Sequence, residues 1–327
     1  MRLGILGTMV WDRIFARDGR GAPIEEWGGI SYALAAMSAA CPQGWELVPL
    51  VKVGRDLEDR ARAFMAELPG LEIGRGVIAV PEANNRVELH YQDRARRCER
   101  LTGGVPPWSW DELRPLVQDL DAIYLNFISG FEMGLETAIR LRMGFKGPIY
   151  CDLHSLMLGI GPDGMRIPRP LADWPEWLKC FDVLQLNEDE LGTLTQAWGD
   201  PWLFAAQAVG PDLRLLLVTL GERGAAYFAS STFTPEPLRW RAGGLGLQRP
   251  LAAPGPVRSG RLAPPSVATE GDPTGCGDVW GATMWARLLG GTGLEGAVHA
   301  ANVAAGRNVQ HRGATGLHHF LQGRIGS

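Results

Sequence analysis

The segment 272–278 reads Asp-Pro-Thr-Gly-Cys-Gly-Asp, so it combines two glycines with an acid at each end. Its glycines allow backbone conformations that other residues avoid. The apolar run 279–289 predicts a helix that begins near Gly275, and the first amides of a helix have no partner inside it. The amides of Gly275–Gly277 could therefore stabilise a transferred phosphoryl group, while Asp278 accepts a proton from the attacking hydroxyl. The alternative is a glycine-rich helix cap in which Asp278 only favours the first turn.

A second pattern could approach a polyphosphate. The apolar run 215–219 ends at Thr219 and enters a turn that contains Gly221 and Gly224. Glycines at such a turn let the backbone come close to a charged ligand. Turns of this kind between strands are equally common without a ligand, so this pattern alone is a weak signal.

A third group of residues could hold a polar acceptor. Gly28 and Gly29 precede a small, apolar helix, and paired glycines would let a polyol lie against the main chain. Asp12 follows the first strand and could bind two neighbouring hydroxyls, or it is an ordinary turn residue. Three polar residues alternate along an extended segment, so one face could reach a substrate or simply be solvated: Arg86, Glu88 and His90.

The elements that must position these residues alternate between short β-rich runs and helical patterns, which predicts an α/β fold with a mostly parallel sheet. The predicted strands are 3–6, 47–53, 122–126, 148–152, 183–186 and 215–219. The predicted helices are 30–40, 57–68, 188–195, 202–209, 279–289 and 294–309.

Three segments interrupt this alternation. Segments 9–27 and 84–102 suit polar-faced strands that form a small lid, with a hairpin turn at Asp18-Gly19, although two surface loops are the alternative. Pro, Gly and Ser crowd 230–265, which predicts an irregular excursion on the surface. The α/β pattern resumes after it, so residues 1–327 are predicted to form one domain.

The composition excludes several classes of function. The chain has 327 residues, 46% of them hydrophobic, and a net charge of −4, which gives no case for nucleic acid or an anionic membrane as a partner. Its five cysteines form no CxxC pair, and no signal peptide or bilayer-spanning run of roughly 18 apolar residues occurs. We therefore expect a cytoplasmic protein. The motifs GxxxxGK[ST] and GxGxxG, which would indicate a P-loop enzyme or a dinucleotide-binding dehydrogenase, are absent from the sequence.

Segment 272–278 resembles the C-terminal motif Asp-x-Thr-Gly-x-Gly-Asp of the ribokinase-like (PfkB) carbohydrate kinase family. The resemblance implies a three-layer α/β/α sandwich with a mostly parallel central sheet and a small β-sheet lid. It also implies an ATP-dependent kinase that transfers the γ-phosphoryl group to a hydroxyl of a sugar, sugar derivative or nucleoside, with Asp278 as the general base. The similarity spans nearly the whole chain, and its motifs occur in the family's order.

The resemblance also implies roles for individual residues. The motif at Asn187 and Glu190 would act on phosphate and Mg²⁺, largely through water, although the same pair could cap a helix. The remaining roles are nucleotide binding by Thr219, Gly221, Gly224 and Asn302; acceptor binding by Asp12, Gly28, Gly29 and Arg86; and a monovalent cation such as K⁺ held by Asp272 and Thr274. Lids of this family often pair between subunits, which implies a homodimer.

The sequence departs from the family pattern mainly on the acceptor side. Ala33 and His154 stand where many sugar kinases carry asparagine, and Cys276 replaces the usual alanine. The phosphate-handling motifs are nearly intact, so phosphoryl transfer is the safer inference and the acceptor stays open. A non-catalytic regulatory protein that binds sugar or nucleotide on the same fold is the alternative, which the intact Asp278 argues against.

Overall fold

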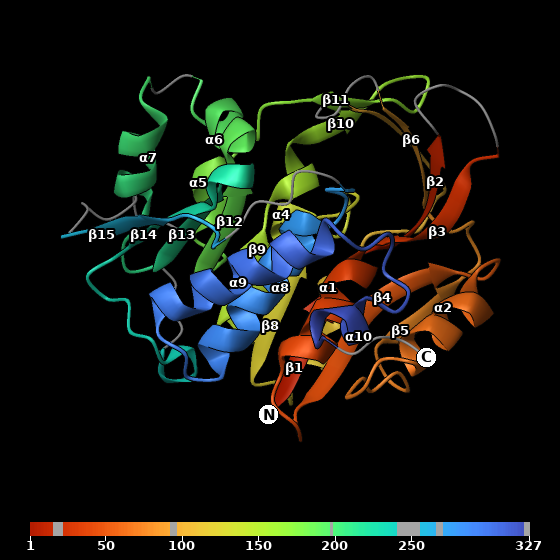
Figure 1. Cartoon of the computed structure of the whole chain (residues 1–327), viewed down its shortest axis with the longest axis horizontal. Coiled ribbons are helices and arrows are strands. Elements are labelled where there is room, and N and C mark those ends of the chain that lie inside the picture. The colour runs from red at the N-terminus through yellow and green to blue at the C-terminus, as the bar shows by residue number, and fades with distance from the viewer. Residues whose placement is uncertain (16–21, 92–96, 197–198, 241–255, 266–270, 324–327) are drawn as a thin grey trace.

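The computed structural model describes residues 1–15, 22–91, 97–196, 199–240, 256–265 and 271–323. A nine-stranded sheet runs through its centre in the order β15-β14-β13-β12-β9-β8-β1-β4-β5 (Figure 1). Neighbouring strands are parallel, except that β14 is antiparallel to both β13 and β15. The strands are β1 (Arg2–Leu6), β4 (Glu46–Gly54), β5 (Val77–Val80), β8 (Ala122–Asn126), β9 (Ile149–Asp152), β12 (Val183–Asn187), β13 (Leu215–Thr219), β14 (Ala225–Ala229) and β15 (Arg258–Leu262).

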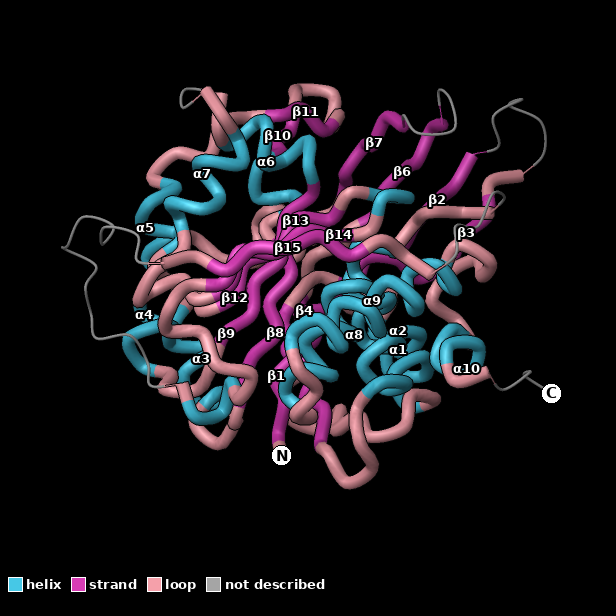
Figure 2. The backbone as a smooth tube through the Cα atoms, turned by 60° about the vertical axis from the view of Figure 1, so that its left-hand side comes forward, coloured by secondary structure: helices cyan, strands magenta, loops and turns pink. Residues whose placement is uncertain are grey.

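Helices cover both faces of this sheet (Figure 2). One face packs against α3 (Trp110–Val117), α4 (Leu135–Gly144), α5 (Trp174–Leu178), α6 (Glu188–Leu194) and α7 (Pro201–Ala208). The other packs against α1 (Ile30–Ala40), α2 (Glu58–Ala66), α8 (Cys276–Leu289), α9 (Leu294–Asn308) and α10 (Leu317–Leu321). Side chains of successive strand residues point to opposite faces of the sheet, so they pack alternately into the two cores. In β8, Tyr124 packs into one core and Leu125 into the other. The predicted three-layer α/β/α fold is confirmed.

A second sheet stands off the main one and forms the lid. It has the order β3-β2-β6-β7 and consists of β2 (Met9–Phe15), β3 (Ile24–Gly29), β6 (Arg86–Tyr91) and β7 (Arg97–Thr102). The small additional sheet predicted from 9–27 and 84–102 is therefore confirmed. The hairpin turn predicted at Asp18-Gly19 lies outside the described residues.

Strand β5 was not among the predicted strands, and two further strand regions differ from the sequence prediction. Within 230–265, residues 258–262 form the edge strand β15 rather than irregular chain, because a largely exposed edge strand reading Arg-Ser-Gly-Arg-Leu carries almost no hydrophobic signal. Residues 241–255 of this segment lie outside the described part. An unpredicted hairpin of β10 (Leu158–Ile160) and β11 (Arg166–Pro168) adjoins the lid, where the Leu101 amide donates to Gly164 O at 2.9 Å.

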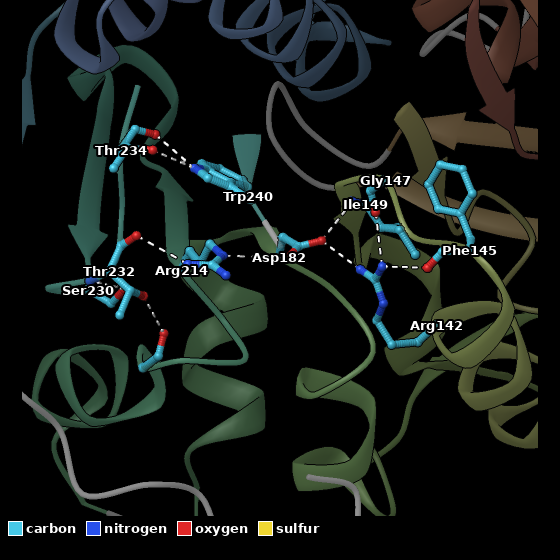
Figure 3. A network of polar contacts seen from close by, with 11 residues as sticks. Arg142, Phe145, Gly147, Ile149, Asp182, Arg214, Ser230, Thr232, Thr234 and Trp240 are labelled. Carbon is cyan, nitrogen blue, oxygen red and sulfur yellow. Dashed lines mark hydrogen bonds and ion pairs between the residues drawn. The ribbon is translucent and has the colours of Figure 1, made fainter. Parts of the chain in front are cut away.

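A buried ion pair ties the amino ends of the parallel strands together (Figure 3). Asp182, just before β12, accepts hydrogen bonds from Arg142 Nη1 at 2.7 Å and from the Ile149 amide at 2.9 Å. Arg214 Nε lies 3.7 Å from the other carboxylate oxygen. Burial raises the pKa of Asp182, and the two arginines oppose that rise. This network stabilises the sheet at the amino ends of its strands, and the polar motifs gather at the opposite, carboxyl ends.

Among the described residues, no helix combines the length and the apolarity that crossing a lipid bilayer requires.

Candidate active site

Asp278 lies in the first turn of α8, and the backbone before it depends on a glycine. Gly275 caps the helix with φ 76° and ψ 0°, in the left-handed region. A β-carbon at this position would lie 2.3 Å from the ring of Tyr32 on α1. Only glycine combines this conformation with this close approach, so the loop can turn sharply and direct the start of α8 toward the carboxyl ends of the strands.

The amides at the start of α8 are not equivalent. In the described part of the chain, the amides of Gly275 and Gly277 have no hydrogen-bond partner, as expected for the start of a helix. The amide of Cys276 instead donates to Pro273 O at 3.1 Å. The prediction that Cys276 contributes to the anion hole is therefore corrected, because its N–H already closes the turn that precedes the helix. Its thiol lies 3.5 Å from Ala305 O, and burial raises its pKa to about 11.

The carboxylate of Asp278 accepts a hydrogen bond from Asn126, the last residue of β8. The distance from Asn126 Nδ2 to Asp278 Oδ1 is 2.7 Å, and the Asn126 side chain is fully buried. Asn126 Oδ1 has no hydrogen-bond partner among the described residues. The asparagine therefore orients the predicted base and leaves one buried acceptor atom beside it.

Asp12 and Gly28, two of the residues predicted to bind the acceptor, pack directly against each other. Asp12 lies on β2 and is 5% exposed. A β-carbon on Gly28 of the neighbouring strand β3 would lie 1.8 Å from Asp12 Oδ2, so only glycine leaves room for this carboxylate. Gly29 follows with φ 60° and caps α1, which carries Tyr32.

The ring of Tyr32 joins the lid side of the site to the base. Burial raises the pKa of Tyr32 strongly, and four nearby carboxylates raise it further: those of Glu26, Asp12, Asp272 and Asp278. Charges act on one hydroxyl in this way only when they are close to it. The fold thus brings the carboxylates of Asp12 of the lid and Asp278 of α8 near the hydroxyl of one buried tyrosine.

Arg86 is not part of this assembly. It pairs with Trp11 in the register of β2 and β6, so it lies on the face of the lid opposite to that of Asp12. There Arg86 Nη2 contacts Asp56 Oδ2 at 2.6 Å and lines a pocket of about 360 Å³ with Trp11 and Arg60. Glu88 and His90 lie on the same outer face, because side chains two apart along a strand point the same way.

On the donor side, Asn187 and Glu190 form a reciprocal cap at the start of α6. The Glu190 amide donates to Asn187 Oδ1, and the Asn187 amide donates to Glu190 Oε2, both at 2.8 Å. The other oxygen of Glu190 lies 3.1 Å from Nδ1 of His154, whose φ of 21° is rare for a residue with a side chain. Burial lowers the pKa of His154, but Glu190 and the carboxylates of Asp152 and Asp278 outweigh it and raise the pKa to about 10.

The turn after β13 lies beside this cap. Thr219 pairs with Asn187 where β12 and β13 end, and Arg223 in the turn forms an ion pair with Glu188 of α6. Gly221 and Gly224 have φ values of 58° and 85°. The three predicted nucleotide-binding positions of this turn, Thr219, Gly221 and Gly224, therefore adjoin the Asn187–Glu190 cap.

The fold is shared with solved structures of kinases. A ribokinase of Thermotoga maritima matches with a TM-score of 0.71 and 16% identity over 98% of both chains. A pyrophosphate-dependent kinase in the ribokinase family, complexed with a pyrophosphate analogue and myo-inositol, matches with a TM-score of 0.71 and 17% identity over 96% of this chain and 97% of its own. Ribokinase of Arabidopsis thaliana, complexed with ribose and ATP, matches with a TM-score of 0.68 and 18% identity over 98% of both chains.

The chain has the ribokinase-like fold. No protein-family model matches the sequence, and no curated protein matches it significantly. The structural likeness therefore rests on the arrangement of the elements rather than on shared residues.

Both ends of the Asn302 side-chain amide form hydrogen bonds within the protein. Its Oδ1 accepts a hydrogen bond from Trp280 Nε1 at 2.8 Å, and its Nδ2 donates to Leu262 O at 3.1 Å. The amide therefore ties α9 to α8 and to β15, and it is only 4% exposed. Nucleotide binding by Asn302 stays a prediction.

Asp272 and Thr274 lie in the loop before α8. Asp272 Oδ1 accepts a hydrogen bond from the Thr274 amide at 2.9 Å, and Thr274 O accepts one from Asn308 at 2.8 Å. Glu26 of the lid is close by, and burial together with the charge of Asp272 raises its pKa. Its Oε1 is buried without a hydrogen-bond partner among the described residues, and the charge of Arg312 opposes the rise in its pKa.

Four residues of the site were missed by sequence reasoning: Asn126, Gln185, Tyr32 and Glu26. Asn126 ends a buried strand, and Gln185 interrupts the otherwise apolar run Val183–Leu186, so a polar residue in a buried strand was the available signal. Tyr32 and Glu26 carried no such signal, because their role depends on the lid and α8 coming together.

Proposed function

We propose that the protein is an ATP-dependent kinase that phosphorylates a hydroxyl of a sugar, a sugar derivative or a nucleoside. The observation that carries the proposal is the start of α8, where a carboxylate oriented by Asn126 lies beside two amides that have no hydrogen-bond partner among the described residues. A helix start of this kind binds anions, and a carboxylate there suits proton acceptance better than phosphate binding. The structural likeness to ribokinases supports the same reaction class.

In the proposed reaction, the acceptor hydroxyl gives its proton to Asp278 as its oxygen attacks the γ-phosphorus. The bond from the γ-phosphorus to the β,γ-bridging oxygen breaks, and ADP leaves with that electron pair. The amides of Gly275 and Gly277 would stabilise the charge on the transferred group. Loss of one preorganised donor of this type lowers kcat by about 100- to 1000-fold.

The donor-side residues fit Mg²⁺ bound together with the nucleotide. Asp152 lies near both Glu190 and Asp278. Burial raises the pKa of Asp152 most, the charge of His154 opposes the rise, and repulsion from Glu190 and Asp278 adds to it. A divalent cation would relieve this repulsion, and Glu190 would reach it through water. When bound, the ion would neutralise charge on the donor phosphates.

A monovalent cation such as K⁺ also fits the residues near Asp272. Glu26 Oε1, which has no hydrogen-bond partner among the described residues, and the carboxylate of Asp272 supply oxygen atoms, and Arg312 also acts on Glu26. Thr274 would contribute from the same loop. These residues would hold the first turn of α8 in place, and the cation would supply only charge.

For the acceptor we propose a polyol or sugar ring held between the lid and α8. Asp12 would bind two neighbouring hydroxyls, and Gly28 would serve this role by leaving room for the Asp12 carboxylate, with the main chain of Gly28 and Gly29 bordering the ring. Two of the similar structures contain ribose and myo-inositol, which supports this class. A homodimer formed through the lid stays a prediction.

A panel of sugars, polyols and nucleosides, each offered with ATP-Mg²⁺ or with pyrophosphate, tests the proposal. We expect ATP-dependent phosphorylation of at least one member, and we expect Asp278→Asn to abolish it while nucleotide affinity stays within about threefold, because an amide cannot accept the proton. Activity of Asp278→Asn near that of the wild type would disprove the role of the base. A panel without any phosphorylation, despite measurable ligand binding, would favour the regulatory binding protein.

A further inference from the structure

Gln185 connects the strands of the donor side to the helix that carries the base. It lies in the middle of β12 and is 2% exposed. Its Nε2 donates to Gly277 O at 3.1 Å and to Asp152 Oδ2 at 2.9 Å, and its Oε1 accepts the hydroxyl hydrogen of Tyr150. One buried amide therefore joins α8 to β9, the strand beside its own.

The orientation of this amide is fixed by its partners. A backbone carbonyl such as Gly277 O can only accept a hydrogen bond, so the NH₂ end of Gln185 must face α8. The Oε1 end then faces Tyr150. Both Nε2 hydrogens are used, so rotation of the side chain would leave a buried carbonyl without a donor, which costs about 1–3 kcal/mol.

A second observation shows how closely α8 approaches this cluster. A β-carbon on Gly281, one turn after Gly277, would lie 2.3 Å from Gln185 Oε1 and 3.0 Å from the Tyr150 hydroxyl. Glycine at 281 thus lets the helix rest directly on the polar side chains beneath it. The hydrogen bond from Gln185 to Gly277 O then sets the rotation of the first turn about the axis of α8 and its position along that axis.

We propose that Gln185 is a positioning residue that holds the first turn of α8, and with it the amides of Gly275 and Gly277 and the carboxylate of Asp278, in register with the donor-binding ends of β12 and β13. The inference rests on the proposed function, because it assigns the anion hole and the base to this turn. Gly277 O and the amide nitrogen of Asp278 belong to one planar peptide unit. Holding that oxygen therefore fixes the backbone from which the base projects.

The proposal predicts a loss of turnover without a loss of binding. A misplacement of about 1 Å at a reacting centre can lower the rate by about 100-fold. Gln185→Met removes both donors at similar length without adding a charge, and Gln185→Glu keeps an acceptor for Tyr150. We expect each variant to lower kcat by about 10- to 100-fold, while the KM for ATP and the KM for the acceptor each change by less than about threefold.

Tyr150→Phe is the matched control. It removes the hydroxyl that donates to Gln185 Oε1 but keeps both bonds of Nε2, and Tyr150 is as buried as Gln185. We expect its thermal stability to fall as in the Gln185 variants and its kcat to stay within about threefold of the wild type. Equal losses of kcat in Tyr150→Phe and Gln185→Met would overturn the proposal, since general packing would then explain both.

Hydrogen exchange gives a readout that does not need an identified acceptor. The peptide that covers 272–281 should exchange faster in Gln185→Met than in the wild type, and Tyr150→Phe should leave it unchanged. Unchanged exchange in Gln185→Met would refute the inference even if no substrate were found. Where a substrate is known, wild-type turnover by Gln185→Met beside an inactive Asp278→Asn would refute the inference alone, whereas an active Asp278→Asn would refute the proposed function.

Discussion

Exchange of the two glycines on either side of Cys276 for alanine should have opposite effects on stability. Gly275 has φ 76°, where a residue with a side chain costs about 1–3 kcal/mol. Its new β-carbon would lie 2.3–2.6 Å from three atoms of the Tyr32 ring, which is 1% exposed and has no open space to enter. Overpacking of this kind costs about 1–3 kcal/mol more, so Gly275→Ala should lower the free energy of unfolding by about 2–6 kcal/mol.

Gly277 offers the contrast within the same turn. It lies inside α8, and the nearest atom to a new β-carbon is Gln185 Nε2 at 3.9 Å, an ordinary contact distance. Replacing a glycine within a helix by alanine stabilises it by about 0.5–1 kcal/mol. Gly277→Ala should therefore unfold at the same or a higher concentration of urea than the wild type.

Urea unfolding followed by circular dichroism measures both variants against the wild type, and phosphoryl transfer measured on folded protein reports the site. Gly277→Ala should stay folded, so any loss of turnover in it reflects the new methyl group beside the proposed anion hole. Equal midpoints for Gly275→Ala and Gly277→Ala would refute the reasoning, because they would mean that neither the left-handed backbone nor Tyr32 constrains residue 275.

Two further predictions concern regions away from the site. Arg142→Met should lower the free energy of unfolding by about 3–5 kcal/mol, since it leaves the Asp182 carboxylate buried beside Arg214 alone, and the double variant with Asp182→Asn should recover part of this in urea unfolding. Burial and the neighbouring His319 lower the pKa of His318, which is 2% exposed, so the folded state prefers the neutral ring. The contribution of His318 to the free energy of unfolding is complete above the unfolded pKa of about 6.5 and is lost as the pH falls below it. A slope in melting temperature between pH 7 and 5 that persists in His318→Leu would contradict this expectation.

Much of the fold was predictable because its signals are local. Buried runs such as 122–126 and 215–219 were assigned with their observed ends, since short apolar strands between turn residues are read from neighbouring positions. The helix 30–40 was likewise predicted at its observed bounds. Strand β15 was missed because an exposed edge strand has no such pattern.

The sequence by itself determined the pattern from which the chemistry of segment 272–278 is proposed, because its glycines, its two acids and its place before a helix all lie in consecutive residues. Which amides are available was decided only by the tertiary structure, because the partner of Cys276 depends on how the preceding turn closes. The contacts of Asn126, Gln185 and Tyr32 with this turn were also decided there. These residues are far from 272–278 in the chain, and hydrogen bonds between distant residues follow from packing rather than from local pattern.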